Sequence, residues 1–166
     1  FRSRGVQLLL NSSAEKMSVT GDKVLLELTD GGQISADMAV ISVGVVPENT
    51  LAKKAGLELG VKGAIKVTSK METSVPDIYA VGDAVQVKHF ITEQDVLISL
   101  AGPANKQGRI AADNICGLDS EYKGSQGSSV IKLFDMTVAT TGMNEQQAGA
   151  SGYEYEKVIL TQNSHA

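Results

Sequence analysis

The sequence predicts a mixed fold in which α/β and α+β parts follow one another along 166 residues. Three observations lead to this prediction. Short alternating apolar runs fill residues 1–45, a helical pattern with small residues covers 103–117, and two further apolar runs precede a short helical pattern after residue 129. Alternation with a period of two is typical of half-buried strands, and spacing of three and four residues is typical of a helix.

Residues 1–45 predict a β-meander that closes on a buried strand. Turn residues at Gly21-Asp22 and at Asp30-Gly31-Gly32 separate the apolar runs. The segment 29–33 is expected to be a hairpin connector and not a phosphate loop, because no helix follows it to present backbone amides. The expected strands are 7–10, 14–19, 23–28 and 37–43.

The middle of the chain predicts a short helix at 49–55, a strand at 64–67 and a second, buried strand at 78–81. The turn before the buried strand is Val75-Pro76-Asp77, since proline fixes its own φ and favours an extended residue before it. A β-excursion from Lys88 to Glu93 is expected between this strand and the helical pattern.

Asp83 follows the buried strand at its carboxyl end, where ligands bind in open α/β sheets. A carboxylate repels phosphate, so its natural partner is a neutral hydroxyl of a sugar or sugar alcohol. Gly82 lets another group approach the backbone closely. Because Gly-Asp is also a common turn, a solvated carboxylate is the alternative interpretation.

The helical pattern predicts a helix that starts at Pro103 and is capped by Gly117, since proline suits a first turn and glycine a C-cap. The backbone amides of Ala101, Gly102 and Ala104 would be free to bind an anion. The alternative is a plain packing helix with solvent at its start. The expected packing face consists of small and apolar residues: Ala104, Gly108, Ala111 and Ile115.

The C-terminal part predicts a flexible connector at 124–128, followed by strands at 130–134 and 136–140, a helix at 144–150 and a strand at 154–160. The β-β-α-β order favours an antiparallel sheet with a covering helix.

The string Thr73 to Asp83 resembles the second flavin-binding motif of the pyridine nucleotide–disulfide oxidoreductases, flavoproteins with two dinucleotide-binding domains. Residues 37–49 resemble the strand that returns from the NAD domain to the FAD domain in that family. Residues 100–109 resemble the flavin-facing helix start of its coenzyme A disulfide reductase and NADH oxidase branch. Residues 132–152 resemble the opening of the dimerisation domain of that branch.

The resemblance implies three parts: 1–45 as the C-terminal part of an NAD(P)-binding domain, 46–122 as the C-terminal part of an FAD-binding domain, and 123–166 as the N-terminal part of a dimerisation domain. It assigns Asp83 to the ribityl chain of FAD and the helix start to the pyrimidine end of the flavin, which becomes negative on reduction. The implied FAD-binding residues are Thr73, Gly82, Asp83, Ala84, Ala101, Gly102 and Ala104.

The resemblance also implies an activity: hydride from NADH or NADPH passes through FAD to a small-molecule disulfide or to oxygen, in a cytoplasmic homodimer formed through the C-terminal domain. The chain holds no Gly-x-Gly-x-x-Gly and no start methionine, so we expect a fragment without either pyrophosphate loop or the redox cysteine, catalytically silent alone. The alternatives are a non-catalytic interaction module that retains the interface domain and a stand-alone nucleotide-binding domain.

Composition excludes several other classes. Lys plus Arg is 15 against 19 for Asp plus Glu, and tryptophan is absent, which argues against nucleic acid and membrane partners. A single cysteine and two isolated histidines, His89 and His165, offer no disulfide and no zinc site.

The remaining reactive residues have ordinary explanations. We expect Cys116 to be an inert, packed thiol, because a helix C-terminus disfavours the thiolate. His89 is expected to be exposed. Lys106 and Arg109 suit a solvated helix face with an ion pair to Asp113, with phosphate binding by Arg109 as the alternative.

Overall fold

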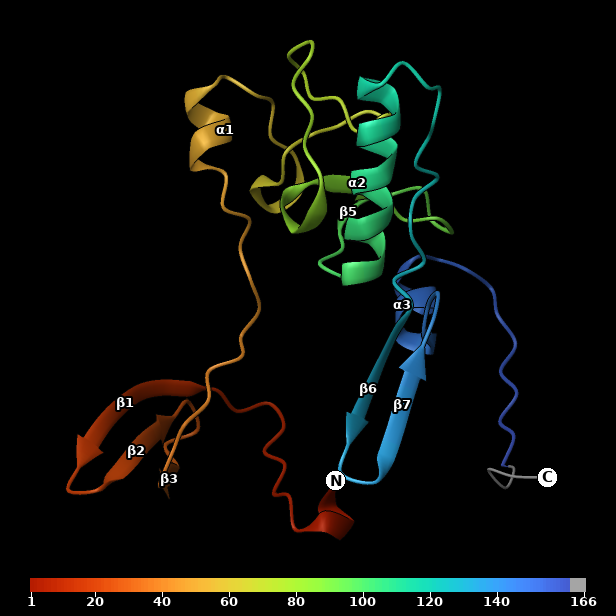
Figure 1. The fold of residues 1–166 in the computed structure, drawn as a ribbon. Helices are drawn as coiled ribbons and strands as arrows, with labels where there is room; N and C mark the ends of the chain where they lie inside the picture. The colour runs from red at the N-terminus through yellow and green to blue at the C-terminus, as the bar shows by residue number, and fades with distance from the viewer. Residues whose placement is uncertain (162–166) are drawn as a thin grey trace. The chain divides into compact units, whose positions relative to one another are not determined.

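The protein is described here by a computed structural model that covers residues 1–161 and divides into two compact units, Phe1–Gly44 and a second unit that begins at Val45. Three separate antiparallel sheets lie in the described residues, one of three strands and two of two strands. The mixed α/β character expected from the sequence is therefore present (Figure 1).

The first unit is the expected β-meander. After a 3₁₀ turn at Arg2–Arg4, strands β1 (Ala14–Thr20), β2 (Lys23–Leu28) and β3 (Gln33–Ala36) pair antiparallel in the order β1-β2-β3 (Figure 1). Thr20 lies opposite Lys23, so the first hairpin has a two-residue loop, and Gly21 in it has a φ of 60°. A bulge between Ala14 and Lys16 bends the start of β1.

The connector between β2 and β3 is the hairpin expected at 29–33. Leu28 N–H donates to the Gly32 carbonyl at 2.9 Å, and Gly32 N–H donates to Asp30 Oδ1 at 2.9 Å. This backbone hydrogen bond, together with one from the Ser12 hydroxyl, lowers the pKa of Asp30 from its ordinary value. The loop is closed by its own side chain and presents no row of amides to a phosphate.

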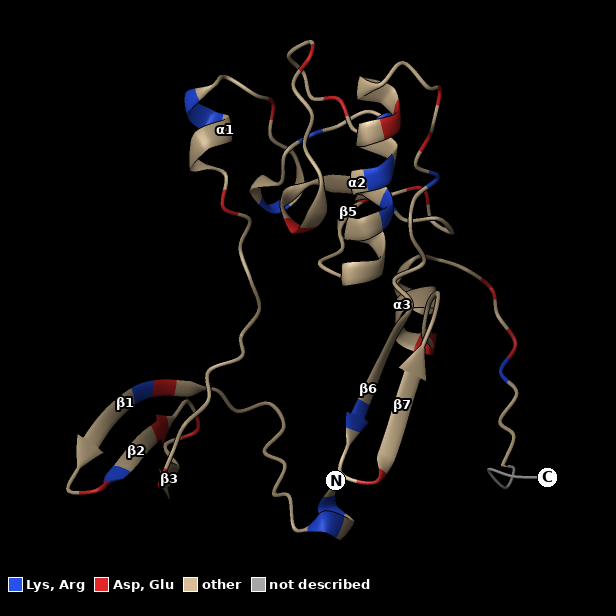
Figure 2. Ribbon diagram, in the orientation of Figure 1, with Lys and Arg blue, Asp and Glu red and all other residues tan. Residues whose placement is uncertain are grey.

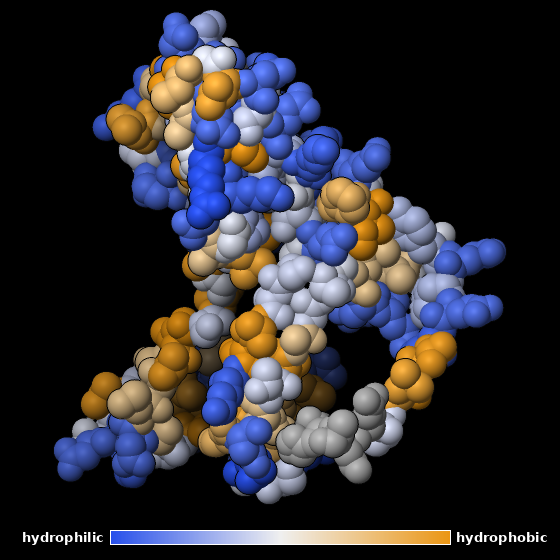
Figure 3. All heavy atoms as spheres, turned by 45° about the vertical axis from the view of Figure 1, so that its right-hand side comes forward, coloured by the Kyte–Doolittle hydropathy of each residue, from blue (hydrophilic) through white to orange (hydrophobic). Residues whose placement is uncertain are grey.

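Two expected strands of this region, 7–10 and 37–43, do not form. Residues 37–43 have no ladder partner in the described chain, and Val40, Ile41 and Val43 are 82%, 71% and 91% exposed. An apolar run of this kind becomes a strand only when at least one neighbouring strand hydrogen-bonds to its backbone. Such exposed apolar side chains appear as orange spheres in Figure 3.

The second unit contains α1 (Thr50–Lys54), the 3₁₀ turns η2 (Val61–Gly63) and η3 (Gly82–Ala84), the hairpin β4 (Gln86–Lys88) with β5 (Asp95–Leu97), and α2 (Ala101–Ile115). Helix α1 and the hairpin confirm the helix expected at 49–55 and the excursion around Lys88 to Glu93. The strand expected at 64–67 is reduced to single bridges from Ile65 to Leu59 and to Val85.

The prediction of a buried strand at 78–81 is also wrong. Only one bridge forms there, between Glu72 and Tyr79, and Ile78 and Val81 are 39% and 41% exposed. The backbone of this segment bonds locally instead, with Ala80 N–H donating to Met71 O at 3.1 Å. The chain therefore reaches Asp83 as an ordered loop and not as the central strand of a sheet.

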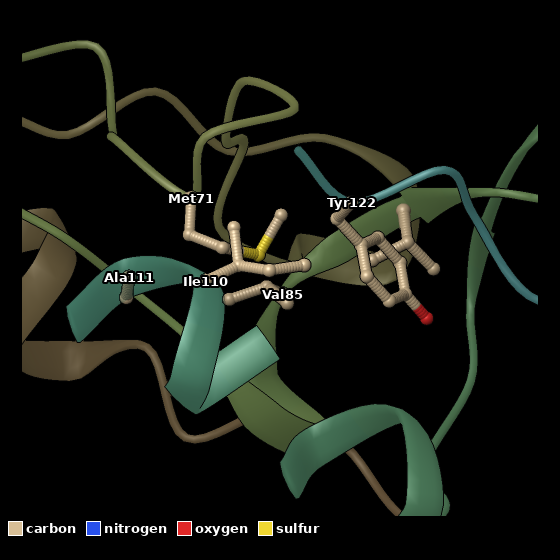
Figure 4. Close-up of a cluster of buried hydrophobic side chains, with 6 residues drawn as sticks. Met71, Val85, Ile110, Ala111 and Tyr122 are labelled. Atoms are coloured by element: carbon tan, nitrogen blue, oxygen red, sulfur yellow. The ribbon is translucent and has the colours of Figure 1, made fainter. Parts of the chain in front are cut away.

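The core of the second unit lies between α2 and the β4–β5 hairpin. Val85 and Val87 from the hairpin region meet Ile110 and Ala111 from α2, and all four are at least nine-tenths buried. Met71 closes the cluster from the loop side, and Tyr122 covers its edge (Figure 4). This cluster fixes α2 against the segment that carries Asp83.

The chain that follows α2 returns to the loop before the Asp83 turn. Tyr122 N–H donates to Ser69 O at 2.7 Å, and Lys70 Nζ lies 2.6 Å from Asp119 Oδ1. The hydrogen bond and charge of Lys70 hold the pKa of the Asp119 carboxyl below its ordinary value.

The connector at 124–128 is held by backbone hydrogen bonds to residues of the β4–β5 hairpin. Phe90 N–H donates to Ser125 O at 3.0 Å, and Ser125 N–H donates to Lys88 O at 3.1 Å, so Ser125 pairs with the β4–β5 hairpin. The expected flexibility is therefore wrong for this stretch, because its backbone groups have partners.

The last elements are β6 (Ser129–Leu133) and β7 (Met136–Thr140), which form a hairpin, and α3 (Glu145–Ala150). Asn144 and Gln147 form a reciprocal capping box at the start of α3, which explains why this short helix exists. The strand expected at 154–160 is absent, and Val158, Ile159 and Leu160 are 78%, 78% and 82% exposed.

Gly124 should be more sensitive to substitution than its neighbour Gly127. Gly124 has a φ of 88°, and an added Cβ would lie 2.5 Å from Lys88 O. Gly127 has a φ of 67° but open space around it. We expect Gly124→Ala to lower the free energy of unfolding by about 2–4 kcal/mol, and Gly127→Ala by only about 1 kcal/mol, in chemical denaturation. Equal losses of stability in the two variants would contradict the close packing of Gly124 against Lys88 O.

Candidate functional site

The loop that leads to Asp83 is closed by Thr73, which is 7% exposed. Its hydroxyl donates to Val75 O at 3.1 Å and accepts from Val75 N–H at 3.3 Å. Ile78 N–H donates to Val75 O at 3.3 Å and Asp77 has a φ of 64°, so the expected turn at Val75-Pro76-Asp77 is confirmed. The Thr73 hydroxyl thus shapes the loop and is engaged within it.

The turn Gly82-Asp83-Ala84 is the 3₁₀ element η3, placed between the loop and β4. Gly82 has a φ of 86°, a conformation that glycine adopts without strain. Ala84 O accepts from Ile65 N–H at 2.8 Å, which anchors the turn from below. The Asp83 side chain is exposed and has no hydrogen bond or ion pair among residues 1–161. A fixed backbone therefore presents a carboxylate with unused acceptor capacity.

One buried hydrogen bond ties this turn to α2. Gly82 N–H donates to Gln107 Oε1 at 2.7 Å, and Gln107 is 1% exposed. Gln107 was not among the residues singled out from the sequence, where only its neighbours Lys106 and Arg109 were assigned to a helix face. The spacing of Gln107 with Ile110 and Ala111 was the available signal, since these three residues are the buried face of the helix.

Helix α2 begins at Ala101, two residues before the expected start at Pro103. Ala104 N–H consequently donates to Leu100 O at 3.1 Å, so the prediction that this amide is free is wrong. The amides of Ala101 and Gly102 have no acceptor within the helix. Both residues are exposed, and no side chain caps this end. The helix therefore presents two free N–H groups and the positive end of its dipole.

The small residues of α2 line an open concave surface beside the turn. Ala101, Ala104, Gly108 and Ala112 border it together with Asn105 and Arg109, and its volume is about 610 Å³. A Cβ built on Gly82 would lie 4.0 Å from the Ala104 Cβ, so the turn and this surface adjoin. The expected packing face is correct only for Ala111, since Ile115 is 64% exposed and Ala104 and Gly108 lie on the open surface.

Cys116 and His89 differ from expectation. Cys116 is an exposed thiol and not a packed one, at the end of α2 that Gly117 caps with a φ of 81°. His89 is half-buried, and its Nδ1 lies 3.2 Å from Thr92 Oγ1.

The other candidates give no reactive site in the described chain. Within residues 1–161, Arg109 and Asp113 form no salt bridge, no cluster of His, Cys, Asp and Glu could hold a metal ion, and no helix is long and apolar enough to cross a membrane. His165 lies outside the described residues.

The family model of pyridine nucleotide-disulphide oxidoreductases matches residues 1–108 of the chain, a range that includes the Asp83 turn and the start of α2. The chain therefore belongs to this family.

Curated relatives carry names from the branch that the resemblance indicated. The NAD(P)H sulfur oxidoreductase (CoA-dependent) of Pyrococcus furiosus is 37% identical over 158 residues, which cover 95% of this chain and 36% of that protein. The NADH oxidase of Methanocaldococcus jannaschii is 40% identical over 143 residues, which cover 86% of this chain and 32% of that protein. The chain spans about a third of the length of these relatives.

Solved structures agree with the fold. The reduced CoADR-RHD of Bacillus anthracis is 47% identical, with a TM-score of 0.87 over 93% of this chain and 28% of that chain. The water-forming NADH oxidase of Lactobacillus brevis, solved with NADH, is 31% identical, with a TM-score of 0.87 over 96% of this chain and 35% of that chain. These neighbours confirm the predicted fold class, which is part of a flavoprotein with two dinucleotide-binding domains.

The Gly82–Gln107 hydrogen bond should contribute measurably to stability. We expect Gln107→Leu to lower the free energy of unfolding by about 1–3 kcal/mol in chemical denaturation, because it leaves a backbone N–H without its acceptor. The control is Asn105→Ala at an exposed position of the same helix, where a change within about 0.5 kcal/mol is expected. A loss in Gln107→Leu no larger than in the control would show that the turn does not depend on Gln107.

Proposed function

We propose that the chain forms one part of a flavin-dependent NAD(P)H oxidoreductase of the coenzyme A disulfide reductase or NADH oxidase type. The observation that carries the proposal is the juxtaposition of the Asp83 turn with the start of α2, held by the Gly82–Gln107 hydrogen bond of 2.7 Å. The relatives named above support it, since their names describe NAD(P)H-dependent reductases and oxidases.

The residues present fit one end of an FAD molecule. The exposed Asp83 carboxylate, which has no partner in the described chain, can accept hydrogen bonds from the hydroxyls of a sugar-alcohol arm. Gly82 has no side chain and leaves the backbone of the turn open to close approach, while Ala84 anchors the turn through its carbonyl. The concave surface over the small residues of α2 gives such an arm room beside the turn. Thr73 contributes by shaping the loop, since its hydroxyl is engaged there.

The start of α2 suits the pyrimidine end of a flavin ring. The free amides of Ala101 and Gly102 can donate hydrogen bonds to a carbonyl oxygen, and the helix dipole favours negative charge at that position. A helix N-terminus contributes about 0.3–1 kcal/mol to such an interaction. Ala104 contributes its small side chain and not its amide, which donates to Leu100 O at 3.1 Å.

In the proposed enzyme, FAD supplies the ring that accepts hydride from NADH or NADPH and passes the electrons to a small-molecule disulfide or to oxygen. The role of this chain is to bind and orient that ring. We assign 1–45 to the C-terminal part of the NAD(P)-binding domain, 46–122 to the C-terminal part of the FAD-binding domain and 123–166 to the N-terminal part of the dimerisation domain.

We also propose that the enzyme is a cytoplasmic homodimer, with 123–166 in its interface. The β6–β7 hairpin exposes Val130, Ile131 and Val138 at 69%, 55% and 47%, and Phe134 in its turn is 64% exposed. A two-stranded hairpin is marginally stable by itself in water and needs further strands or a covering surface. A partner subunit would provide that cover.

Asp83 should determine flavin retention. We expect Asp83→Ala in the full-length protein to raise the dissociation constant for FAD about tenfold or more, because a charge-assisted hydrogen bond contributes about 1.5–3 kcal/mol. Asp83→Asn keeps one carbonyl acceptor and should lose about threefold. The ratio of flavin absorbance to protein after dialysis measures the effect.

The control is Asp113→Ala, which removes the same charge from the far half of α2 and should leave the flavin ratio unchanged. Full flavin retention in Asp83→Ala would refute the assignment of the turn to FAD.

A further inference from the structure

A second concavity lies on the other face of the first turns of α2. Gly102 and Lys106 of the helix border it, together with Phe90 from the β4–β5 loop and Tyr122, Lys123 and Ser125 from the segment after α2. Its volume is about 410 Å³. An adjoining hollow of about 380 Å³ shares Phe90, Tyr122 and Lys123 with it. None of the residues that border the small-residue surface of α2 borders this cavity.

Tyr122 places an unused polar group at this cavity. The residue is 7% exposed, its ring packs on the core cluster, and its backbone N–H is bonded to Ser69 O. Its hydroxyl has no hydrogen-bond partner among residues 1–161. Figure 4 shows the hydroxyl pointing away from Met71 and Val85, out of the cluster. A phenol in this position can donate one hydrogen bond to a bound ligand without moving its ring.

The charge at the cavity is positive and not neutralised. Lys106 and Lys123 form no ion pair in the described chain, whereas Lys70 is paired with Asp119 and Lys88 with Asp95. No Asp or Glu borders the cavity, and Glu93 borders only the adjoining hollow. Figure 2 shows basic residues on α2 and on the segment that runs beside it. Two ammonium groups without an ion-pair partner that border one cavity attract an anion.

The cavity also has an apolar wall. Phe90 is 55% exposed and borders both hollows. An exposed aromatic ring beside two lysines suits a ligand that carries a phosphate on an organic group. The ring can pack on the organic part, and the lysines can bind the phosphate.

We propose that this cavity binds the phosphate group of an organic phosphate ester, with Lys106 and Lys123 as the charge partners, the Tyr122 hydroxyl as a hydrogen-bond donor and Phe90 as the packing surface. The cavity shares Gly102 with the proposed FAD contacts, but none of the four side chains assigned to the phosphate ester takes part in those contacts. Substitutions of these four side chains therefore test the cavity independently of the flavin assignment.

The test uses the full-length, flavin-loaded protein and two probes, phenyl phosphate and inorganic phosphate, in titration calorimetry. We expect phenyl phosphate to bind more tightly than inorganic phosphate. The double substitution Lys106→Gln with Lys123→Gln should lower the association constant of phenyl phosphate at least about tenfold, since two charge-assisted contacts are lost. The control Lys54→Gln removes one exposed charge on α1 and should leave binding unchanged.

Two single variants define the other contacts. Tyr122→Phe keeps the ring and the core packing and should weaken both probes about threefold, without changing the unfolding midpoint. Phe90→Ala should weaken phenyl phosphate and leave inorganic phosphate unchanged. Phosphate that binds at nucleotide sites elsewhere in the protein should be the same in each variant and in the Lys54→Gln control. A difference between a variant and this control therefore reports on the cavity alone.

Three results would overturn the proposal: no binding of phenyl phosphate at millimolar concentration, equal binding in the double variant and the Lys54→Gln control, or equal effects of Phe90→Ala on both probes. The last result would reduce the cavity to a site for free phosphate. Circular dichroism and flavin content of each variant distinguish lost binding from lost folding.

Discussion

The hydrogen bond from Gly82 N–H to Gln107 Oε1 joins the two halves of the candidate site. Its acceptor Gln107 is 1% exposed, so it has no solvent partner in place of this bond, and its donor belongs to a glycine with a φ of 86°, which other residues adopt only with strain. The core cluster holds α2 in place, and this bond then sets the distance between the Asp83 carboxylate and the helix start. A site for an extended cofactor depends on such spacing more than on any single contact.

Helix α2 is used on three faces. Its core face buries Gln107, Ile110 and Ala111. Its small-residue face borders the open surface beside Gly82. Its third face carries Lys106, which borders the cavity next to Tyr122 and Lys123. The two open faces meet at the first turn, where Ala101 and Gly102 hold the unbonded amides. One helix can therefore orient a flavin on one side and present a separate anion site on the other.

Local signals in the sequence predicted the elements that local chemistry determines. The hairpin at Asp30-Gly31-Gly32, the turn at Val75-Pro76-Asp77 and the helix that begins after Asn144 all formed, because their own side chains close them. The strands expected at 37–43 and 154–160 did not form, since a strand needs hydrogen-bonding neighbours that the described chain does not provide. The structure changes two details of the candidate site, whose role in flavin binding stays a prediction. Helix α2 begins at Ala101, so the Ala104 amide is already bonded to Leu100 O. Gln107 was missed because a buried polar residue resembles a surface one in a periodicity argument.

The unpaired stretch after β3 has a consequence for the synthesis of this protein. Residues 40–46 combine bare aliphatic side chains with backbone amides and carbonyls that have no ladder partner in the described chain, and Val43 is 91% exposed. That combination is what adds to the edge of another chain during aggregation. This stretch precedes α2 in the chain and is therefore synthesised first, so its backbone groups are open to other chains until something pairs with them.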